Sequence, residues 1–251
     1  MTAPLFFLPP GTLAVVRVSS RVELDGAEGH HAARVRRVRP GEQVLLADGS
    51  GWLAHATVLL VADGGVELSI DRITEPSPAR PRLILAQALA KGGRDELAIE
   101  VATELGVDEV LAWQAERSVV VWRGDRGAKS LAKWAAVVTA AAKQARRADL
   151  PQVSGLVSTT GLVERVGECV SGGGECLVLH EESPHHLASS DLAGCPEILL
   201  VVGPEGGISP SELATLTDAG ARSVRLGPTV LRTSTAGPAA LAILSARYRW
   251  T

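Results

Sequence analysis

The sequence has few of the residues that would place it in a specialised class. It contains 251 residues and three cysteines, an odd number whose spacing fits neither a metal site nor a redox motif. Such usage suits reduced thiols in a cytoplasm better than a disulfide framework, so we expect Cys169, Cys176 and Cys195 to be structural. Basic residues are not in excess, because 25 Lys and Arg stand against 28 Asp and Glu, a net charge of −3. Any role in nucleic-acid binding must therefore depend on local patches.

Long apolar runs are also missing. The longest apolar segment, residues 134–142, is far too short to span a membrane and is flanked by Lys133 and Lys143. The first residues carry no early positive charge, and Pro9 and Pro10 interrupt their apolar stretch, so they make a poor signal peptide. We therefore expect a soluble, cytoplasmic protein. With 46% hydrophobic residues the composition is globular, and the length suggests one large or two ordinary domains.

The most informative stretch is residues 198–244. An apolar run at 198–202 predicts a buried strand that ends at the sequence GPEGG, residues 203–207. Ser209, Pro210 and Glu212 then predict a helix start with a capping box, and Gly220 predicts its end. A second strand, residues 224–226, ends at Gly227-Pro228, and a loop leads to a final helix that begins at Pro238.

Ligands of open parallel sheets bind beyond the carboxyl ends of the strands, where loops meet and helix N-termini offer free N–H groups. Both Gly-Pro loops are predicted at that edge. A single GPEGG could be only a tight turn, but a second loop of similar design favours a binding site.

The run LVVGPEGG-x-S-x-x-E followed by LG-P-x-x-LR-x-x-TA resembles the signature of the SPOUT methyltransferases. It is most similar to the bacterial 16S rRNA (uracil-N3)-methyltransferase family, the RsmE type. The resemblance implies a C-terminal SPOUT-type α/β domain with a trefoil knot, S-adenosyl-L-methionine as cofactor and a homodimer. It also implies 16S rRNA in the small ribosomal subunit as partner, with no metal.

The first part of the chain predicts a small β-barrel. Its β-rich runs are residues 13–18, 43–46, 52–61 and 66–70, with hairpin turns at 48–51 and 63–65. It resembles the PUA-like N-terminal RNA-binding module of the same family. A short segment contains four arginines, Arg34, Arg36, Arg37 and Arg39. They suit either a solvated helix face or contacts with phosphate groups.

Three prolines, Pro76, Pro78 and Pro81, mark a linker, so we predict domains at 1–74 and 82–251. The second domain opens with a strand at 83–89, a helix at 96–105 and a strand at 107–113. The Leu97 side of that helix is predicted to be buried, and the loop with Lys91 and Arg94 is either an RNA-backbone contact or a plain exposed turn.

The longest predicted helix covers residues 131–145. After it, Gln144, Arg147 and Pro151 match a family element, and Arg147 is a further candidate RNA contact. Ala140 and Lys143 depart from the acidic residues that are usual there, so a role for those carboxylates is not carried over. Beyond it we predict a helix at 162–166 and a strand at 176–179.

By resemblance, the cofactor lies among three loops. The implied binding residues are Leu179, His180, Gly203, Pro204, Glu205, Gly206, Gly207, Leu226, Gly227, Leu231, Thr233, Ser234 and Ala236. Arg232 is the candidate catalytic residue, and its competing interpretation is a structural ion pair with a carboxylate such as Glu205. Thr229 and Ser234 replace the family's usual arginine and acidic residue, so no general-base role is assigned to them.

Methylation at uracil N3 requires an unpaired base, because N3 lies on the Watson–Crick edge. The N3 proton must leave, and a cation near the base carbonyls would favour the deprotonated form. Alternatives are a non-catalytic RNA-binding or ribosome-assembly factor, action on another RNA position, or another cofactor such as a nucleotide. No phosphate-binding G-x-x-x-x-G-K-[ST] or G-x-G-x-x-G motif supports the last.

Overall fold

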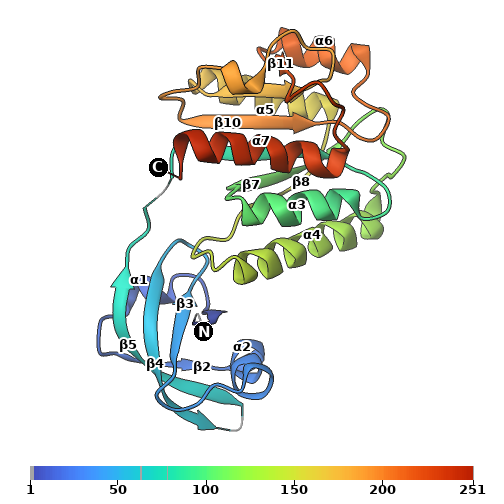
Figure 1. Cartoon of the computed structure of the whole chain (residues 1–251). Helices are drawn as coiled ribbons and strands as arrows, with labels where there is room; N and C mark the ends of the chain where they lie inside the picture. Colours follow the sequence, from blue (N-terminus) through green and yellow to red (C-terminus); the bar gives the residue numbers. More distant parts are fainter. Residues whose placement is uncertain (1–2, 63, 78, 251) are drawn as a thin grey trace. The chain divides into compact units, whose positions relative to one another are not determined.

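The chain forms two compact units in a computed structural model that describes residues 3–62, 64–77 and 79–250. One unit contains residues 1–78 and 142–150, and the other contains 79–141 and 151–251 (Figure 1). Each unit is described separately below.

The first unit is built on a five-stranded sheet in the order β1-β3-β4-β5-β2. The β1–β3 pair is parallel and the other pairs are antiparallel. The strands are β1 (Leu5–Phe7), β2 (Arg21–Leu24), β3 (Gln43–Ala47), β4 (Leu53–Ala62) and β5 (Gly65–Thr74). Short helices are α1 (Thr12–Val15), α2 (Gly26–His30) and the π-helix η1 (His31–Arg36). Alternate residues of β3, β4 and β5 form one apolar core with Phe6 and Leu13.

The prediction of a strand at residues 13–18 is wrong, because this segment begins with α1. Thr12 donates its N–H and its hydroxyl to the carbonyl of Pro9, which starts a helical turn. Leu13 donates its N–H to Asp48 Oδ2 at 3.2 Å and is buried. Strands β1 and β2 were not predicted, and Asp63 of the predicted 63–65 turn lies outside the described residues.

Residues 142–150 belong to the first unit, although residues 142–144 are the end of the longest helix, α4 (Gly124–Gln144). Lys143 Nζ lies 2.7 and 2.8 Å from the two carboxylate oxygens of Glu28 and 5.4 Å from the centre of the Phe6 ring. Leu150 donates its N–H to the Gly49 carbonyl at 2.9 Å. Gly49 has φ +77°, and a Cβ there would lie 2.9 Å from Leu150 Cδ1, so the turn requires glycine.

The second unit contains a six-stranded parallel sheet in the order β11-β9-β10-β6-β7-β8. Its strands are β6 (Arg82–Ala88), β7 (Glu109–Gln114), β8 (Gln152–Ser158), β9 (Glu175–Leu179), β10 (Glu197–Val202) and β11 (Arg222–Val224). Its helices are α3 (Arg94–Glu104), α4 (Gly124–Gln144), α5 (Thr159–Ser171), the 3₁₀-helix η2 (Leu187–Ser189), α6 (Pro210–Asp218) and α7 (Thr233–Tyr248). An all-parallel sheet of this kind needs both faces covered, and its central strands are accordingly apolar.

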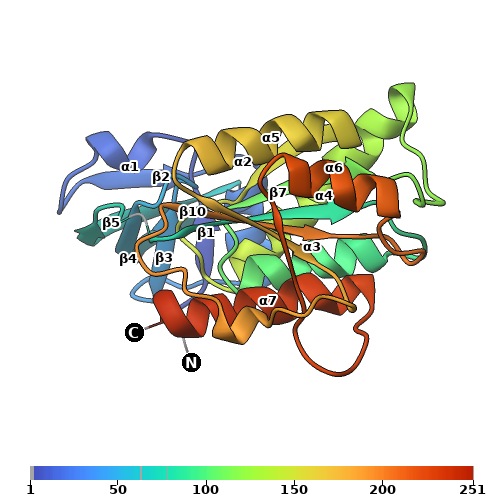
Figure 2. The same ribbon diagram turned by 90° about the horizontal axis from the view of Figure 1, so that it is seen from above.

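Helices cover the sheet on two sides, α5 and α6 on one and α3 and α7 on the other (Figure 2). Successive residues of β6 therefore point into different cores. Leu83 and Leu85 pack in the core with α3, α4 and α7, whereas Ile84 and Ala86 pack in the core with α5 and α6.

Several predicted boundaries and faces differ from the structure. Strand β8 was not predicted, and β11 ends at Val224, where the second Gly-Pro strand was predicted to begin. Helix α3 buries Ala98, Ile99 and Ala102, whereas Leu97 is 47% exposed, so the predicted burial of Leu97 was wrong, while Leu105 of the same predicted face is half-buried against the core. Helix α7 begins at Thr233 rather than Pro238, because the Arg232 carbonyl accepts hydrogen bonds from the N–H groups of residues 235 and 236.

Candidate active site

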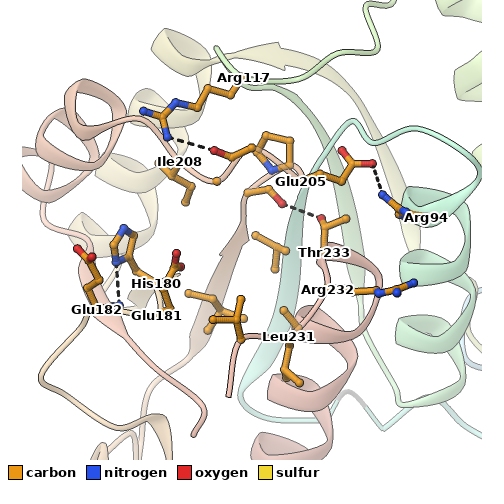
Figure 3. Close-up of a pocket in the computed structure, with 18 of the residues that line it drawn as sticks. Arg94, Arg117, His180, Glu181, Glu182, Glu205, Ile208, Leu231, Arg232 and Thr233 are labelled. Carbon is orange, nitrogen blue, oxygen red and sulfur yellow. Dashed lines mark hydrogen bonds and ion pairs between the residues drawn. The ribbon is translucent and has the colours of Figure 1, made fainter. Parts of the chain in front are cut away.

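Three loops of the second unit enclose a pocket of about 650 Å³ (Figure 3). They follow β9, follow β10 and precede α7, and they contribute His180, Gly203 and Arg232 among others. A smaller hollow of about 70 Å³ shares His180 and Leu231 and is also lined by Leu226 and Gly227. The site therefore lies at the carboxyl edge of β9 and β10, where the sequence predicted it.

The loop Gly203 to Gly207 is fixed by its glycines and by a polar link to α7. A Cβ at Gly203 would lie 2.7 Å from Ile208 Cγ1, and Gly207 has φ +71° with its N–H donating to the Pro204 carbonyl. Thr233 Oγ1 donates to the Gly203 carbonyl at 2.7 Å and accepts from Gln87 Nε2 at 2.9 Å. The loop, the end of β6 and the start of α7 are thus joined by one buried and one partly buried hydrogen bond.

An ion pair holds this loop from the side of α3. Glu205 Oε1 accepts from Arg94 Nη1 at 2.9 Å and from the Lys91 N–H at 3.1 Å. Burial alone would raise the pKa of Glu205, but hydrogen bonds from its own N–H, from the Lys91 N–H and from Arg94 outweigh it and lower the pKa. The carboxylate is therefore charged at neutral pH and ties the loop after β6 to the loop after β10.

A second arginine holds the same loop from the side of β7. Arg117 Nη1 donates to the Gly206 carbonyl at 3.1 Å, and a Cβ at Gly206 would lie 3.2 Å from Arg117 Cβ. The neighbouring Glu116 donates its N–H to the buried Glu212 carboxylate at 2.8 Å. Glu212 also accepts from Thr159 Oγ1 at 2.8 Å and completes the predicted capping box with Ser209.

The loop after β9 is anchored to β11. The His180 N–H donates to the Val224 carbonyl at 2.9 Å, and Ser183 Oγ donates to the Ser223 carbonyl at 2.8 Å. His180 Nδ1 accepts from the Glu182 N–H at 3.3 Å, which places the proton of a neutral imidazole on Nε2. Glu181 and Glu182 line the same side of the pocket and add negative charge to it.

Arg232 is the N-cap residue of α7 and lines the large pocket. Its guanidinium is exposed and makes no hydrogen bond or ion pair within the described residues. Glu205 pairs with Arg94 instead, so the interpretation of Arg232 as the partner of Glu205 is wrong. Figure 3 shows Arg232 and Arg94 on one side of the pocket, across from His180.

The structure brings most of the predicted cofactor residues to the two hollows. Ser234 is the exception, since it is buried in the first turn of α7. The residues that line one or both hollows are Leu179, His180, Gly203, Pro204, Glu205, Gly206, Gly207, Leu226, Gly227, Leu231, Thr233 and Ala236. Arg117, Ile208 and Val230 also line the large pocket and were not predicted. Proximity of Val230 to Leu231 in the sequence was the only signal for it.

The candidate RNA contacts fall in both units. Arg34 and Arg36 lie on η1, and Arg37 and Arg39 follow it, all four exposed. Arg37 is in the left-handed region with φ 54°, which lets the chain turn sharply after η1. Arg147 is ion-paired with Asp149, and its side chain is only 11% exposed.

The described residues give no sign of a metal centre or a membrane span. They contain no group of three or more His, Cys, Asp or Glu side chains arranged to hold a metal ion. Across residues 3–62, 64–77 and 79–250, no helix combines the length and apolar character needed to cross a bilayer. The three cysteines are unpaired, and burial raises the pKa of Cys169 to about 11.

Comparisons with known proteins point to one family. The family described as "RNA methyltransferase domain" matches residues 76–245, and "RNA methyltransferase PUA domain" matches residues 24–71. The chain is 51% identical to Ribosomal RNA small subunit methyltransferase E of Mycobacterium bovis, over 99% of this chain and 94% of that protein. The Bacillus subtilis protein of the same name is 30% identical over 88% of each chain. A crystal structure of the Neisseria gonorrhoeae protein of that name bound to S-adenosyl methionine aligns with TM-score 0.85, 28% identity and full coverage of both chains.

Proposed function

Because the chain belongs to the RNA methyltransferase family of the Ribosomal RNA small subunit methyltransferase E proteins, we propose that it methylates N3 of a uridine in 16S rRNA. It is an S-adenosylmethionine-dependent rRNA methyltransferase with a PUA-like and a mixed α/β part. The observation that carries the proposal is the pocket formed by the two Gly-Pro loops and the loop after β9.

The pocket suits the cofactor in size and charge. Its volume of about 650 Å³ lies within the range of small-molecule sites. Gly207 has φ +71° and no heavy atom within 4 Å of where a Cβ would lie, so a ligand can approach the main chain there, whereas the missing side chains of Gly203 and Gly206 leave room for Ile208 and Arg117. Glu181 and Glu182 suit a cofactor that carries positive charge. When bound, S-adenosylmethionine supplies an activated methyl group on a sulfonium.

Arg232 is the residue that we assign to the reaction. Uracil N3 must lose its proton, and the negative charge then spreads onto the two flanking carbonyl oxygens. An unpaired guanidinium at the pocket can stabilise that charge, and Arg232 has no competing carboxylate partner among the described residues. The chain's other contribution is orientation, since the loops around the pocket are held by Arg94, Arg117 and Thr233.

Three further features belong to the same proposal. The last segment is threaded to form a trefoil knot of the SPOUT type, and two copies form a homodimer through this domain. Residues 1–74 bind RNA through Arg34, Arg36, Arg37 and Arg39, supported by Lys91 and Arg94 from the second domain at 82–251. Arg147 is a weaker candidate, since its ion pair with Asp149 would have to open. We also propose that the protein works in the cytoplasm on the small ribosomal subunit.

The test is single-turnover methyl transfer to small subunits that lack the modification, with Arg232→Ala beside the wild type. We expect the single-turnover rate constant to fall by roughly 10²–10³, the effect of losing one preorganised electrostatic donor, with cofactor affinity and melting temperature little changed. Arg232→Lys, which keeps the charge, should recover part of the rate. Full turnover by Arg232→Ala would remove Arg232 from the mechanism.

Two other readouts test the rest of the proposal. Methyl label at a position other than uracil N3 would refute the substrate. Cofactor binding by calorimetry without any transfer would favour the alternative of a non-catalytic RNA-binding or assembly factor. A monomer in light scattering at micromolar concentration would contradict the homodimer.

A further inference from the structure

The segment between β7 and α4 presents an unusual face to solvent. It opens with a turn at residues 116–117, and from Arg117 to Arg123 exposed residues alternate with buried or half-buried ones. Val119 and Val121 are 72% and 44% exposed, whereas Trp122 is 8% exposed. Arg117 and Arg123 are exposed on either side of the valines, and Arg126 follows in the first turn of α4. We call the five residues Arg117, Val119, Val121, Arg123 and Arg126 the arginine ridge.

The backbone of the ridge is fixed by hydrogen bonds and by packing on its buried side. Gln114 uses its side-chain amide as a substitute for a neighbouring strand: Nε2 donates to the Val120 carbonyl at 2.9 Å, and Oε1 accepts from the Trp122 N–H at 3.3 Å. The Trp122 ring packs edge-on against Trp134 of α4, with ring centres 5.3 Å apart. The exposed side chains therefore project from a fixed backbone rather than from a loose loop.

The charges of the ridge are not neutralised by the protein. Arg123 and Arg126 border a hollow of about 330 Å³ with Val121, and neither guanidinium makes an ion pair or hydrogen bond in the described part of the chain. Asp125 is exposed beside them and pairs with neither. Several other arginines of this unit are ion-paired, as in Arg82–Glu109, Arg165–Glu197 and Arg222–Glu175, although Arg232 at the large pocket is not, among the residues that the structure describes.

The position of Arg123 and Arg126 makes their positive charge energetically unfavourable. Arg123 and Arg126 stand at the start of α4, where the helix dipole is positive and cations are disfavoured. Repulsion among unpaired cations at such a place is relieved when an anion binds between them. The arrangement thus points to an anionic partner, and the exposed valines between the arginines indicate one that also carries apolar surface.

We propose that the arginine ridge binds the backbone of the RNA strand that carries the target base. RNA offers both chemistries, phosphates for the guanidinium groups and ribose and base faces for the valines. Arg117 connects the ridge to the site, because it lines the large pocket and donates to the Gly206 carbonyl at 3.1 Å. A strand that follows the ridge therefore arrives at the pocket. The inference rests on the proposed function and adds a substrate-binding surface to it.

The experiment measures binding of 16S rRNA transcribed in vitro to the double variant Arg123→Gln/Arg126→Gln over a range of salt concentrations. Removal of one phosphate-binding arginine should reduce the slope of log K against log salt by about 0.7 for single-stranded RNA, so removal of two corresponds to a roughly 25-fold weaker affinity near 0.1 M salt. Neither residue lines the large pocket, so cofactor affinity, melting temperature and kcat at saturating RNA should stay at wild-type values. KM for RNA should rise.

Arg222→Gln is the matched control, because Arg222 is 45% exposed but ion-paired with Glu175 on strands β11 and β9. Its salt slope should equal that of the wild type. An unchanged slope and RNA affinity in the double variant would overturn the inference. So would a change of oligomeric state in light scattering, which would make the ridge a contact between copies of the chain. RNA binding is measured directly and does not depend on catalysis. Failure of the wild type to transfer methyl groups would therefore refute the proposed function, but the RNA-binding measurement would still test the inference about the ridge.

Discussion

The ion pair between Arg94 and Glu205 gives a quantitative test of how the cofactor loop is held. Three variants are compared with the wild type: Arg94→Ala, Glu205→Ala and the double variant. The two side chains are 36% and 21% exposed, so solvent screens their attraction. Double-mutant cycles on exposed pairs give about 0.2–1 kcal/mol. We expect a coupling in that range, which corresponds to about a 1.4-fold to 5-fold change in the Kd for S-adenosylmethionine if the pair acts only on the bound loop.

Glu205→Ala should weaken cofactor binding more than Arg94→Ala. Glu205 Oε1 accepts two hydrogen bonds, from Arg94 and from the Lys91 N–H, whereas loss of Arg94 removes one of them. A net hydrogen bond is worth about 0.5–1.5 kcal/mol, and somewhat more when one group is charged. The expected order of Kd is therefore wild type, Arg94→Ala, and then Glu205→Ala.

Isothermal titration calorimetry gives the Kd values, and the control is the pair Arg222–Glu175, which is 45% and 34% exposed. Its coupling in folding stability should be similar in size, but it should have no coupling in cofactor affinity. The reasoning is refuted if the cofactor coupling of Arg94–Glu205 does not exceed that of the control pair. It is also refuted if Glu205→Ala binds the cofactor as tightly as the wild type.

Three more outcomes are expected. Gly203→Ala should weaken cofactor binding at least about tenfold, because the new Cβ would lie 2.7 Å from Ile208 Cγ1. The control is Gly167→Ala on α5, where a Cβ meets open space, and this change should raise the melting temperature slightly. Burial works against ionisation of Glu205, but hydrogen bonds outweigh it and lower the pKa of this carboxyl. The stability that the ionised carboxylate adds is therefore present above about pH 4.5 and is lost as the pH falls through the lowered pKa. In acid denaturation, the difference in unfolding free energy between the wild type and Glu205→Gln should shrink below pH 4.5. Burial raises the pKa of Cys169 to about 11, so mass spectrometry should find this thiol unmodified by an alkylating reagent at pH 7 until denaturant is added.

Local signals predicted the segments in which neighbouring residues decide the structure. The spacing of Ser209, Pro210 and Glu212 predicted the start of α6, and the structure has the complete capping box with proline in the first turn. The apolar run of β10 was predicted to within one residue. The same reasoning failed at residues 13–18, because the Leu13 N–H donates to Asp48 Oδ2, 35 residues away in the sequence, and the Leu13 side chain packs in the apolar core with Phe6. β-propensity alone could not report that contact.

Three of the hydrogen bonds that shape the pocket could not be predicted, because each joins residues that are far apart in the sequence. Thr233 is 30 residues from Gly203, Arg117 is 89 residues from Gly206, and Arg94 is 111 residues from Glu205. The resemblance to a family predicted many residues of the site, but it did not indicate which of them form hydrogen bonds or ion pairs with one another. The incorrect partner considered for Arg232 is an example. Glu205 was a candidate from the sequence, but in the structure its carboxylate pairs with Arg94.

Glu212 shows how a local signal and the architecture of the site meet in one residue. The sequence identified it only as the third residue of a helix start. In the structure its Oε2 accepts from the Ser209 N–H, while its Oε1 accepts from the Glu116 N–H and from Thr159 Oγ1, partners 96 and 53 residues away. A carboxylate that is 4% exposed needs such partners, because an uncompensated buried charge is strongly destabilising. The helix cap therefore also fixes Glu116, next to the arginine that holds Gly206, so a residue in the first turn of α6 helps to set the shape of the cofactor loop.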